Sequence, residues 1–321
     1  MTNWRILNTL DLTGAPEAVA AIEEVGELVS LPPERDHVLK NIADFDVYFA
    51  SAKVRVDPQF LDAARRLKLI GTPSTGTDHL DIEEIGKRGV ACMDIATEYE
   101  LINSFTATSE LSFGLLLSLV RKIPAALRVA REGEWARERF TGFQLSQKTL
   151  GILGLGRLGR ITARIGQGFG MRVIGHDIRD VSVDGVENVS FDELLQNADV
   201  LSIHIHLTPA TEGLIGRAEF AKMKRTAILL NTSRGRIIDE VALLAALQGN
   251  KLAGAGLDVI DGEWLTQQEL LRHPLILYSR KYENLLISPH IGGMTTESIY
   301  GARVFMAQRI AEWIMVRSSV E

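Results

Sequence analysis

A glycine-rich turn near the middle of the chain, at residues 154–159, is the feature that most constrains the fold. It reads Gly-Leu-Gly-Arg-Leu-Gly, and an apolar run at residues 150–153 leads into it. A helical pattern of apolar residues follows at 161–169, and a second apolar run at 171–175 stops at His176-Asp177. Strand, glycine turn, helix, strand and acid, in this order, predict the βαβ unit of a dinucleotide-binding domain.

Each glycine of the turn has an expected task. Gly154 permits the tight turn, Gly156 lets a pyrophosphate approach the backbone, and Gly159 lets the helix pack closely on the strand. The amides of the first helical turn and the helix dipole would hold the phosphates. Asp177, which lies 23 residues after Gly154, would accept hydrogen bonds from the adenosine ribose. An acid here repels a 2′-phosphate and favours NAD, while Arg179 keeps NADP open.

Length, charge and cysteine content limit the class of protein. At 321 residues the chain is too long for one ordinary core, so two domains are expected. No apolar run is long enough to span a bilayer, and the net charge of −6 argues against a nucleic-acid partner. The single cysteine, Cys92, excludes an internal disulfide framework and fits a reducing cytoplasm. We expect His204 and His206 to share one face of a strand, but predict no metal site because a third ligand is missing.

Short apolar runs alternate with helix-length amphipathic stretches along the whole chain, which predicts an α/β fold with parallel sheets covered on both faces. The strands are expected at residues 4–8, 47–50, 69–71, 90–93, 150–153, 172–175, 200–205, 227–231, 253–259 and 285–288. The helices are expected at residues 16–25, 33–42, 58–66, 82–88, 106–121, 191–196, 217–222, 240–248 and 295–316.

In the second half of the chain, polar residues interrupt the apolar runs where strands end. Arg234 follows a buried strand, and its planar guanidinium suits a carboxylate, although an ion pair that closes the loop would also explain it. Asp258 ends the next strand, and Glu263 lies in the loop beyond it. His290 follows a third strand, and its pKa near neutrality suits a proton donor. Because open parallel sheets bind ligands at this edge, we expect Arg234, Glu263 and His290 to lie together.

With these residues assembled, the chain resembles the D-isomer-specific 2-hydroxyacid dehydrogenase family over essentially its whole length. The resemblance rests on the order and spacing of several motifs together. Besides the glycine turn, they are residues 74–81 (Ser-Thr-Gly-Thr-Asp-His-Leu-Asp), 204–211 (His-Ile-His-Leu-Thr-Pro-Ala-Thr), 231–235 (Asn-Thr-Ser-Arg-Gly), 257–259 (Leu-Asp-Val) with Glu263, and 288–293 (Ser-Pro-His-Ile-Gly-Gly).

The resemblance implies two doubly wound parallel-sheet domains, with a Rossmann NAD-binding domain inserted into a flavodoxin-like substrate domain. The substrate domain would comprise residues 1–101 and 289–321, and the dinucleotide-binding domain residues 102–288. The segment 106–121 would be the interdomain helix, although a buried core helix fits its apolar pattern as well. The family also implies a homodimer built largely on the cofactor domains, and hinge closure over the crevice.

The resemblance also implies catalytic roles. Arg234 would hold the carboxylate and carbonyl oxygen of a 2-keto acid. His290 would protonate that oxygen as hydride arrives from the nicotinamide, and Glu263 would pair with His290 and raise its pKa. The backbone amides of Thr75 and Gly76 would bind the substrate carboxylate.

Cofactor contacts follow from the same motifs. Arg157 and Leu158 would meet the pyrophosphate through backbone N–H groups. Ribose or nicotinamide contacts are expected from Thr208, Thr232 and Asp258, with Gly292 also at the cofactor. His206 stands where the family commonly has proline, and either a cofactor contact or a cover over the strand end would explain it.

Other features leave alternatives open. Trp264 stands where the family usually has proline, and residues 264–284 form a long segment, so Asp261 rivals Glu263 as the partner of His290. A formate dehydrogenase would carry glutamine in place of Glu263. A phosphite dehydrogenase, or an NAD(H)-sensing protein like the corepressor relatives, remains an alternative to a 2-hydroxyacid dehydrogenase. The substrate is left open among glyoxylate, hydroxypyruvate, phosphohydroxypyruvate and larger keto acids, although Lys53 and Arg55 would suit an acidic side chain.

Overall fold

A computed structural model describes residues 4–319, so residues 1–3 and 320–321 of the predicted substrate domain lie outside the described part. The chain divides into two compact units. Unit 1 comprises residues 1–105 and 294–321, and unit 2 comprises residues 106–293. Each unit contains one parallel β-sheet with helices on both faces, which confirms the predicted fold class.

Unit 1 contains a five-stranded sheet in the order β2-β1-β3-β4-β5, the flavodoxin-like order. Its strands are β1 (Trp4–Asn8), β2 (Gly26–Ser30), β3 (Val47–Phe49), β4 (Leu69–Gly71) and β5 (Ala91–Met93). Its helices are α1 (Pro16–Glu23), α2 (Arg35–Asn41), α3 (Pro58–Ala63), α4 (Ile82–Lys87), α5 (Tyr99–Ile102) and α14 (Thr296–Ser318). Alternate residues of β1 enter opposite cores: Ile6 joins the cluster under α1 and α14, and Leu7 joins the cluster under α2 and α3.

Unit 2 contains a seven-stranded sheet in the order β12-β11-β10-β9-β6-β7-β8, a Rossmann order with one added strand. Its strands are β6 (Thr149–Leu153), β7 (Arg172–His176), β8 (Val186–Asn188), β9 (Val200–Ile203), β10 (Ile228–Asn231), β11 (Gly254–Leu257) and β12 (Leu285–Ile287). Its helices are α6 (Ala107–Val120), α7 (Ile123–Arg131), α8 (Arg157–Gly168), α9 (Phe191–Asn197), α10 (Arg217–Lys222), α11 (Glu240–Gln248), α12 (Gln267–Leu270) and α13 (Pro274–Ser279).

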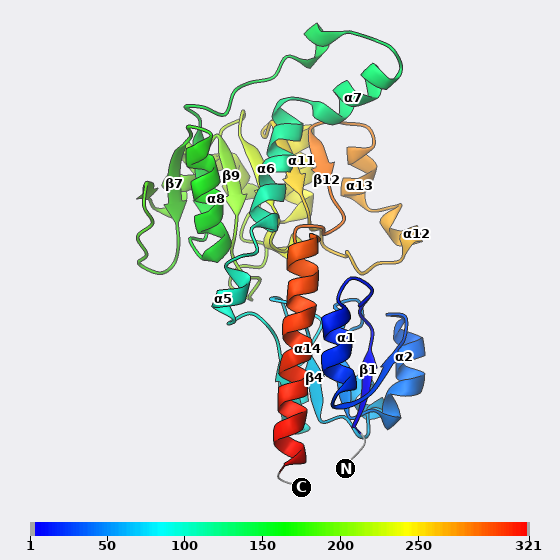
Figure 1. Cartoon of the computed structure of the whole chain (residues 1–321). Coiled ribbons are helices and arrows are strands. Elements are labelled where there is room, and N and C mark those ends of the chain that lie inside the picture. The colour runs from blue at the N-terminus through cyan, green and yellow to red at the C-terminus, as the bar shows by residue number, and fades with distance from the viewer. Residues whose placement is uncertain (1–3, 320–321) are drawn as a thin grey trace. The chain divides into compact units, whose positions relative to one another are not determined.

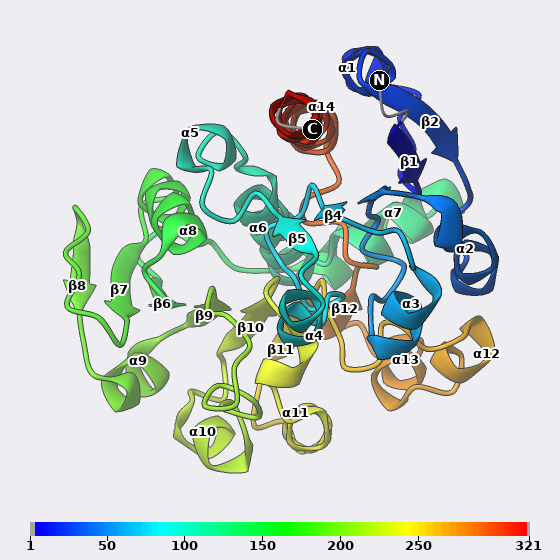
Figure 2. The same cartoon turned by 90° about the horizontal axis from the view of Figure 1, so that it is seen from below.

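Helices α6 and α8 lie on one side of this sheet, and α9, α10 and α11 lie on the other (Figure 2). The buried side chains form two separate clusters, one on each face. The segment that runs from α7 to β6 projects away from the body of unit 2 (Figure 1). Because the strands are parallel, their carboxyl ends meet at one edge, where the loops after β6, β9, β10, β11 and β12 can form a site.

The structure corrects the expectation for the two histidines after β9. The strand ends at Ile203, before either histidine, so His204 and His206 do not alternate along it. The backbone N–H of His204 still donates to the carbonyl oxygen of Leu153 at 2.7 Å, but its ring turns back to Ser202, with Nε2 2.8 Å from Oγ. Burial lowers the pKa of His204 to about 4, while His206 is exposed. The two rings therefore lie in different environments.

Candidate active site

The glycine turn joins β6 to α8, and two of its glycines are required by geometry. Gly154 has a φ of 96°, in the left-handed region that favours glycine, and a Cβ there would lie 2.5 Å from the carbonyl oxygen of His204. A Cβ on Gly159 would lie 2.0 Å from the carbonyl oxygen of Gly154. The tight turn and the close packing of α8 therefore both depend on the absence of a side chain.

Gly156, the N-cap of α8, shows that a dinucleotide fits here. A Cβ on this residue would meet only the Nη2 atom of Arg179, at 4.0 Å, so the space beside the backbone is open. The cap supplies no side-chain hydrogen bond to the helix, which opens with Arg157 and Leu158. Backbone N–H groups at such a helix start, with the helix dipole behind them, bind phosphate. The residues present therefore fit the pyrophosphate of NAD or NADP.

Asp177 follows β7, and its carboxylate accepts hydrogen bonds from two residues. Oδ2 accepts from the backbone N–H of Leu155 at 2.8 Å, and Oδ1 accepts from the backbone N–H and Nε of Arg179 at 3.0 and 3.1 Å. Partial burial raises the pKa of this carboxyl, but the hydrogen bonds outweigh burial and lower it to about 2. Because ribose hydroxyls need the same oxygens, they would compete with Arg179.

Helix α6 holds two of the predicted cofactor segments through small polar side chains that the sequence reasoning missed. Buried Ser109 donates through Oγ to the carbonyl oxygen of Leu158 at 3.1 Å. Buried Ser112 lies with its Oγ 3.0 Å from Oγ1 of Thr232. The helix therefore connects the glycine turn to the end of β10. Polar residues within an otherwise apolar helix were the signal that could have found them.

The turn after β9 adjoins the glycine turn, because the carbonyl oxygen of His204 lies against Gly154. Thr211 shapes this turn: its Oγ1 accepts from the backbone N–H of Thr208 at 2.8 Å and donates to the carbonyl oxygen of His206 at 2.7 Å. The side chains of His206 and Thr208 are exposed. The loop is therefore fixed by internal hydrogen bonds, and both side chains are open to a ligand.

The loop after β10 carries Arg234 and is shaped by buried Asn231. The Oδ1 atom of Asn231 accepts from the backbone N–H of Ser233 at 3.0 Å, and its Nδ2 donates to the carbonyl oxygen of Arg234 at 2.9 Å. The guanidinium of Arg234 is partly buried, and Nη1 donates to the carbonyl oxygen of Ser233 at 2.7 Å. A short side-chain clamp thus fixes the backbone from which Arg234 projects.

His290 and Glu263 form a close pair, with Nδ1 of the imidazole 2.5 Å from Oε2 of the carboxylate. The hydrogen bond to Glu263 raises the pKa of His290. Burial and the charge of Arg234 oppose this rise, and the charge of Asp258 adds to it. With Nδ1 engaged, Nε2 is the ring nitrogen that can exchange a proton with a ligand. The structure pairs His290 with Glu263 and not with Asp261.

Asp258, at the end of β11, is buried and holds the His290 loop. Its Oδ1 accepts from Oγ of Ser288 at 2.6 Å and from the N–H of Ile291 at 2.9 Å, and its Oδ2 accepts from the N–H of Gly292 at 2.7 Å. Its carbonyl oxygen accepts from the N–H of His290 at 2.9 Å. His290 has a φ of 53°, in the left-handed region that non-glycine residues rarely adopt. These hydrogen bonds explain how the loop keeps that conformation.

Thr75 and Gly76 belong to unit 1, in the loop that follows the carboxyl end of β4. Thr75 is exposed and Gly76 is partly buried. The carbonyl oxygen of Ser74 accepts a hydrogen bond from the N–H of Ile95 at 3.3 Å, which ties this loop to the segment after β5. The loop thus occupies the ligand-binding edge of its own sheet.

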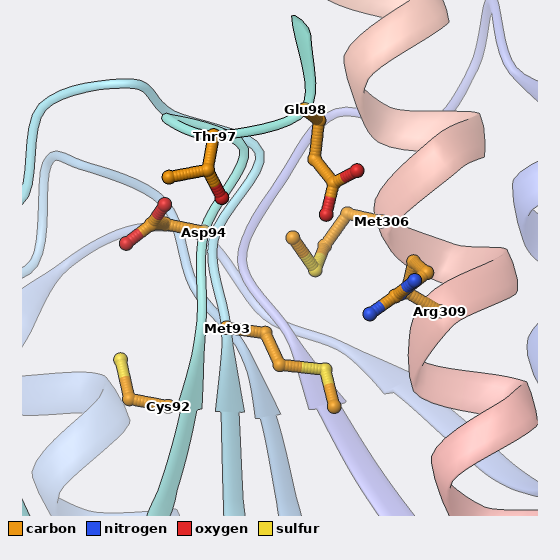
Figure 3. A pocket seen from close by; sticks show the side chains of 7 residues that line it. All are labelled: Cys92, Met93, Asp94, Thr97, Glu98, Met306 and Arg309. Carbon is orange, nitrogen blue, oxygen red and sulfur yellow. The ribbon is translucent and has the colours of Figure 1, made fainter. Parts of the chain in front are cut away.

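A pocket of about 250 Å³ lies between the end of β5 and α14, and it contains none of the predicted site residues (Figure 3). It is lined by Cys92, Met93, Asp94, Thr97, Glu98, Met306 and Arg309. Over residues 4–319, no cluster of three His, Cys, Asp or Glu side chains could hold a metal ion. Within the same range, no helix is both long enough and apolar enough to cross a membrane.

Two family models match the chain. Residues 113–292 match the one described as D-isomer specific 2-hydroxyacid dehydrogenase, NAD binding domain. Residues 7–100 match the one described as D-isomer specific 2-hydroxyacid dehydrogenase, catalytic domain. Together they account for most of the chain and for both structural units.

Individual proteins show the same similarity. The chain is 35% identical to D-3-phosphoglycerate dehydrogenase of Methanocaldococcus jannaschii over 92% of its length, but spans only 55% of that relative. It is 37% identical to glyoxylate reductase of Thermococcus litoralis, covering 87% of the chain and 82% of the relative. A structure of D-lactate dehydrogenase from Aquifex aeolicus, complexed with NAD and lactic acid, superposes with a TM-score of 0.82 at 25% identity, covering 97% of this chain and 96% of that one.

Proposed function

The chain belongs to the D-isomer specific 2-hydroxyacid dehydrogenase family and is an NAD(P)-dependent oxidoreductase of 2-hydroxy and 2-keto acids; we propose that Arg234, Glu263 and His290 carry its reaction. The observation that supports this assignment most directly is the 2.5 Å contact between His290 and Glu263. A histidine held by a carboxylate at one ring nitrogen has the other free for proton transfer. The comparisons do not favour a formate-type, phosphite-type or purely NAD-sensing protein.

In this mechanism the side chains bind the substrate and supply the proton. Arg234 pairs with the substrate carboxylate and polarises the carbonyl oxygen, because its planar fork offers several donors at once. His290 donates the proton from Nε2 to that oxygen in the reduction and takes it back in the oxidation. Glu263 stabilises the imidazolium and orients the ring. The nicotinamide, when bound, supplies or accepts the hydride.

For the cofactor, we propose that NAD is preferred over NADP. The backbone amides of Arg157 and Leu158 would bind the pyrophosphate, and Asp177 the adenosine ribose. Support comes from the open space at Gly156 and from the ionised state of Asp177, whose pKa is about 2. Contacts to ribose or nicotinamide would come from His206, Thr208, Thr232, Asp258 and Gly292.

The two units would divide the work in the way the family domains do. Unit 1 would be the substrate domain, with the backbone amides of Thr75 and Gly76 bound to the carboxylate, and unit 2 the dinucleotide-binding domain. We also propose a cytoplasmic location, since a lone cysteine suits a reducing compartment, and no nucleic-acid partner, given the net charge of −6.

We propose that a second copy of the chain binds to the projecting segment between α7 and β6. Helix α7 exposes Ile123 and Leu127, and the segment beyond exposes Trp135, at 88%, and Phe143. Exposed large apolar side chains grouped on one segment are typical of an interface. Sedimentation of the wild type as a dimer, and of Trp135→Ala as a species shifted toward monomer, would support this; a monomeric wild type would refute it.

The experiment that tests the reaction follows NADH and NADPH absorbance with glyoxylate, pyruvate, hydroxypyruvate and phosphohydroxypyruvate. His290→Gln should lower kcat by about 10²–10⁴-fold, the contribution of a general acid, while NADH binding is retained. Glu283→Gln provides a control, because Glu283 is an exposed acid of the same unit that forms a surface ion pair with Arg128. Unchanged turnover in His290→Gln would remove His290 from the mechanism.

A further inference from the structure

Unit 2 contains a second histidine–carboxylate pair, at positions that no function assigned so far requires. Glu240 is the first residue of α11, and His273 is the residue that precedes α13. Nε2 of His273 lies 3.2 Å from Oε2 of Glu240, and the two side chains are only 9% and 17% exposed. A buried ionisable pair is costly to desolvate, so its retention calls for an explanation beyond stability.

The pair holds both backbone polar groups of one residue, Asp261. The backbone N–H of Asp261 donates to Oε1 of Glu240 at 2.7 Å. Its carbonyl oxygen lies 3.1 Å from Nε2 of His273. Because both neighbours of Nε2 are oxygen acceptors, this nitrogen carries the hydrogen and donates. The remaining ring nitrogen, Nδ1, is buried and has no hydrogen-bond partner among residues 4–319, so the hydrogen bonds that orient the ring are those to Asp261 and Glu240.

Asp261 stands where the loops of the proposed site meet. It precedes Glu263 by two residues, with only Gly262 between them, and Gly262 has a φ of 84°. The backbone of residues 260–261 also lies against Gly235, the neighbour of Arg234: a Cβ on Gly235 would come within 2.4 Å of the Asp261 nitrogen. A displacement of the Asp261 backbone would therefore reach Glu263 and the Arg234 loop together.

We propose that Glu240 and His273 are positioning residues, which fix the Asp261 backbone so that Glu263 stays on Nδ1 of His290. The proposal rests on the proposed function, in which the His290–Glu263 pair transfers the proton. Among the described residues, the charged groups that shift the pKa of His290 are Glu263, Asp258 and Arg234, and neither Glu240 nor His273 is among them. Any effect of the pair on His290 therefore passes through the loop.

The test compares wild type, His273→Ala, His273→Gln and Tyr278→Phe. Glutamine retains a side-chain N–H donor and should restore part of what alanine loses. Tyr278→Phe is the matched control, because it removes a hydrogen bond to Asn284 from α13, the helix that His273 precedes, without touching Asp261. In His273→Ala we expect kcat to fall about tenfold to a hundredfold, as displaced catalytic groups do, with the NADH dissociation constant within twofold of wild type.

A second readout does not depend on turnover. Titration of the His290 ring by NMR should give a lower pKa in His273→Ala than in wild type, because the hydrogen bond between Glu263 and Nδ1 of His290 forms in a smaller fraction of the molecules. Tyr278→Phe should leave that pKa unchanged. The proposal fails if His273→Ala lowers the melting temperature but leaves the His290 pKa at the wild-type value. A wild type that reduces no 2-keto acid would refute the proposed function instead, while the NMR comparison would still decide the positioning role.

Discussion

Replacing Asp258 by asparagine should loosen the His290 loop by an amount that its hydrogen bonds define. In the structure the carboxylate accepts from Ser288, Ile291 and Gly292. Asparagine keeps Oδ1 but turns Oδ2 into an NH2 group that faces the N–H of Gly292. Loss of one charge-assisted bond costs about 1.5–3 kcal/mol, and conversion of the other two from charged to neutral costs about 0.5–1 kcal/mol each, since neutral bonds contribute about 1 kcal/mol. The total is about 2.5–5 kcal/mol.

Calorimetry of the unfolding of unit 2 is the assay. At about 2–4 °C per kcal/mol for a domain of this size, Asp258→Asn should lower the melting temperature by about 5–20 °C. Ser288→Ala, which removes one of the three bonds, should lower it by less than half as much. Turnover should fall as well, because His290 loses the support of its left-handed backbone. A melting temperature within 2 °C of wild type would refute the view that Asp258 holds this loop.

Three further predictions follow from the site. Glu263→Gln should shift keto-acid reduction to lower pH, because Glu263 raises the pKa of His290 and so keeps the histidine protonated to higher pH. The stability gained from the pair is fully present below the ordinary histidine pKa and is lost as the pH rises through the raised pKa. A pH–rate profile like that of wild type would contradict this. Gly154→Ala should lower the free energy of unfolding by about 2 kcal/mol or more, since φ is 96° and the new Cβ meets a backbone carbonyl. Unfolding in urea measures this loss, and an unchanged midpoint would count against the prediction. Arg179→Ala should remove the guanidinium from the oxygens of Asp177, while the backbone N–H donors remain, and should shift the NADH-to-NADPH affinity ratio toward NADH by roughly tenfold, the effect of one charge-assisted hydrogen bond. An unchanged ratio in a fluorescence titration would exclude this competition.

The bounds of the helices and strands show what a local sequence pattern can and cannot predict. The bounds of α10, α11 and β1 match the predicted ranges, because the spacing of their buried apolar residues marks each element in the sequence. Strands β2 and β8 were missed, because both are edge strands whose side chains are mostly half-buried or exposed, so no apolar run identifies them. Helices α12 and α13 were also missed, within a stretch interpreted as a long loop.

Within the proposed site, the sequence indicated candidate side chains, but not the residues that hold them in place. Glu263 could be named because it follows a buried strand, yet nothing local distinguishes its pairing with His290 from the Asp261 alternative. That choice depends on Glu240 and His273, which approach Asp261 from elements 21 and 12 residues away. Hydrogen bonds between distant segments are set by tertiary packing, and a single sequence does not report them.

The left-handed backbone of His290 has a consequence for variants of this protein that are selected for stability. Glycine at this position would relieve backbone strain of about 1–2 kcal/mol. Where this strain exceeds the stability gained from the pair with Glu263, a selection for thermal stability alone would favour the loss of the imidazole. The relief of backbone strain and the proposed catalytic role of His290 oppose each other, so variants of the chain screened only for expression or heat resistance should drift toward folded but inactive proteins.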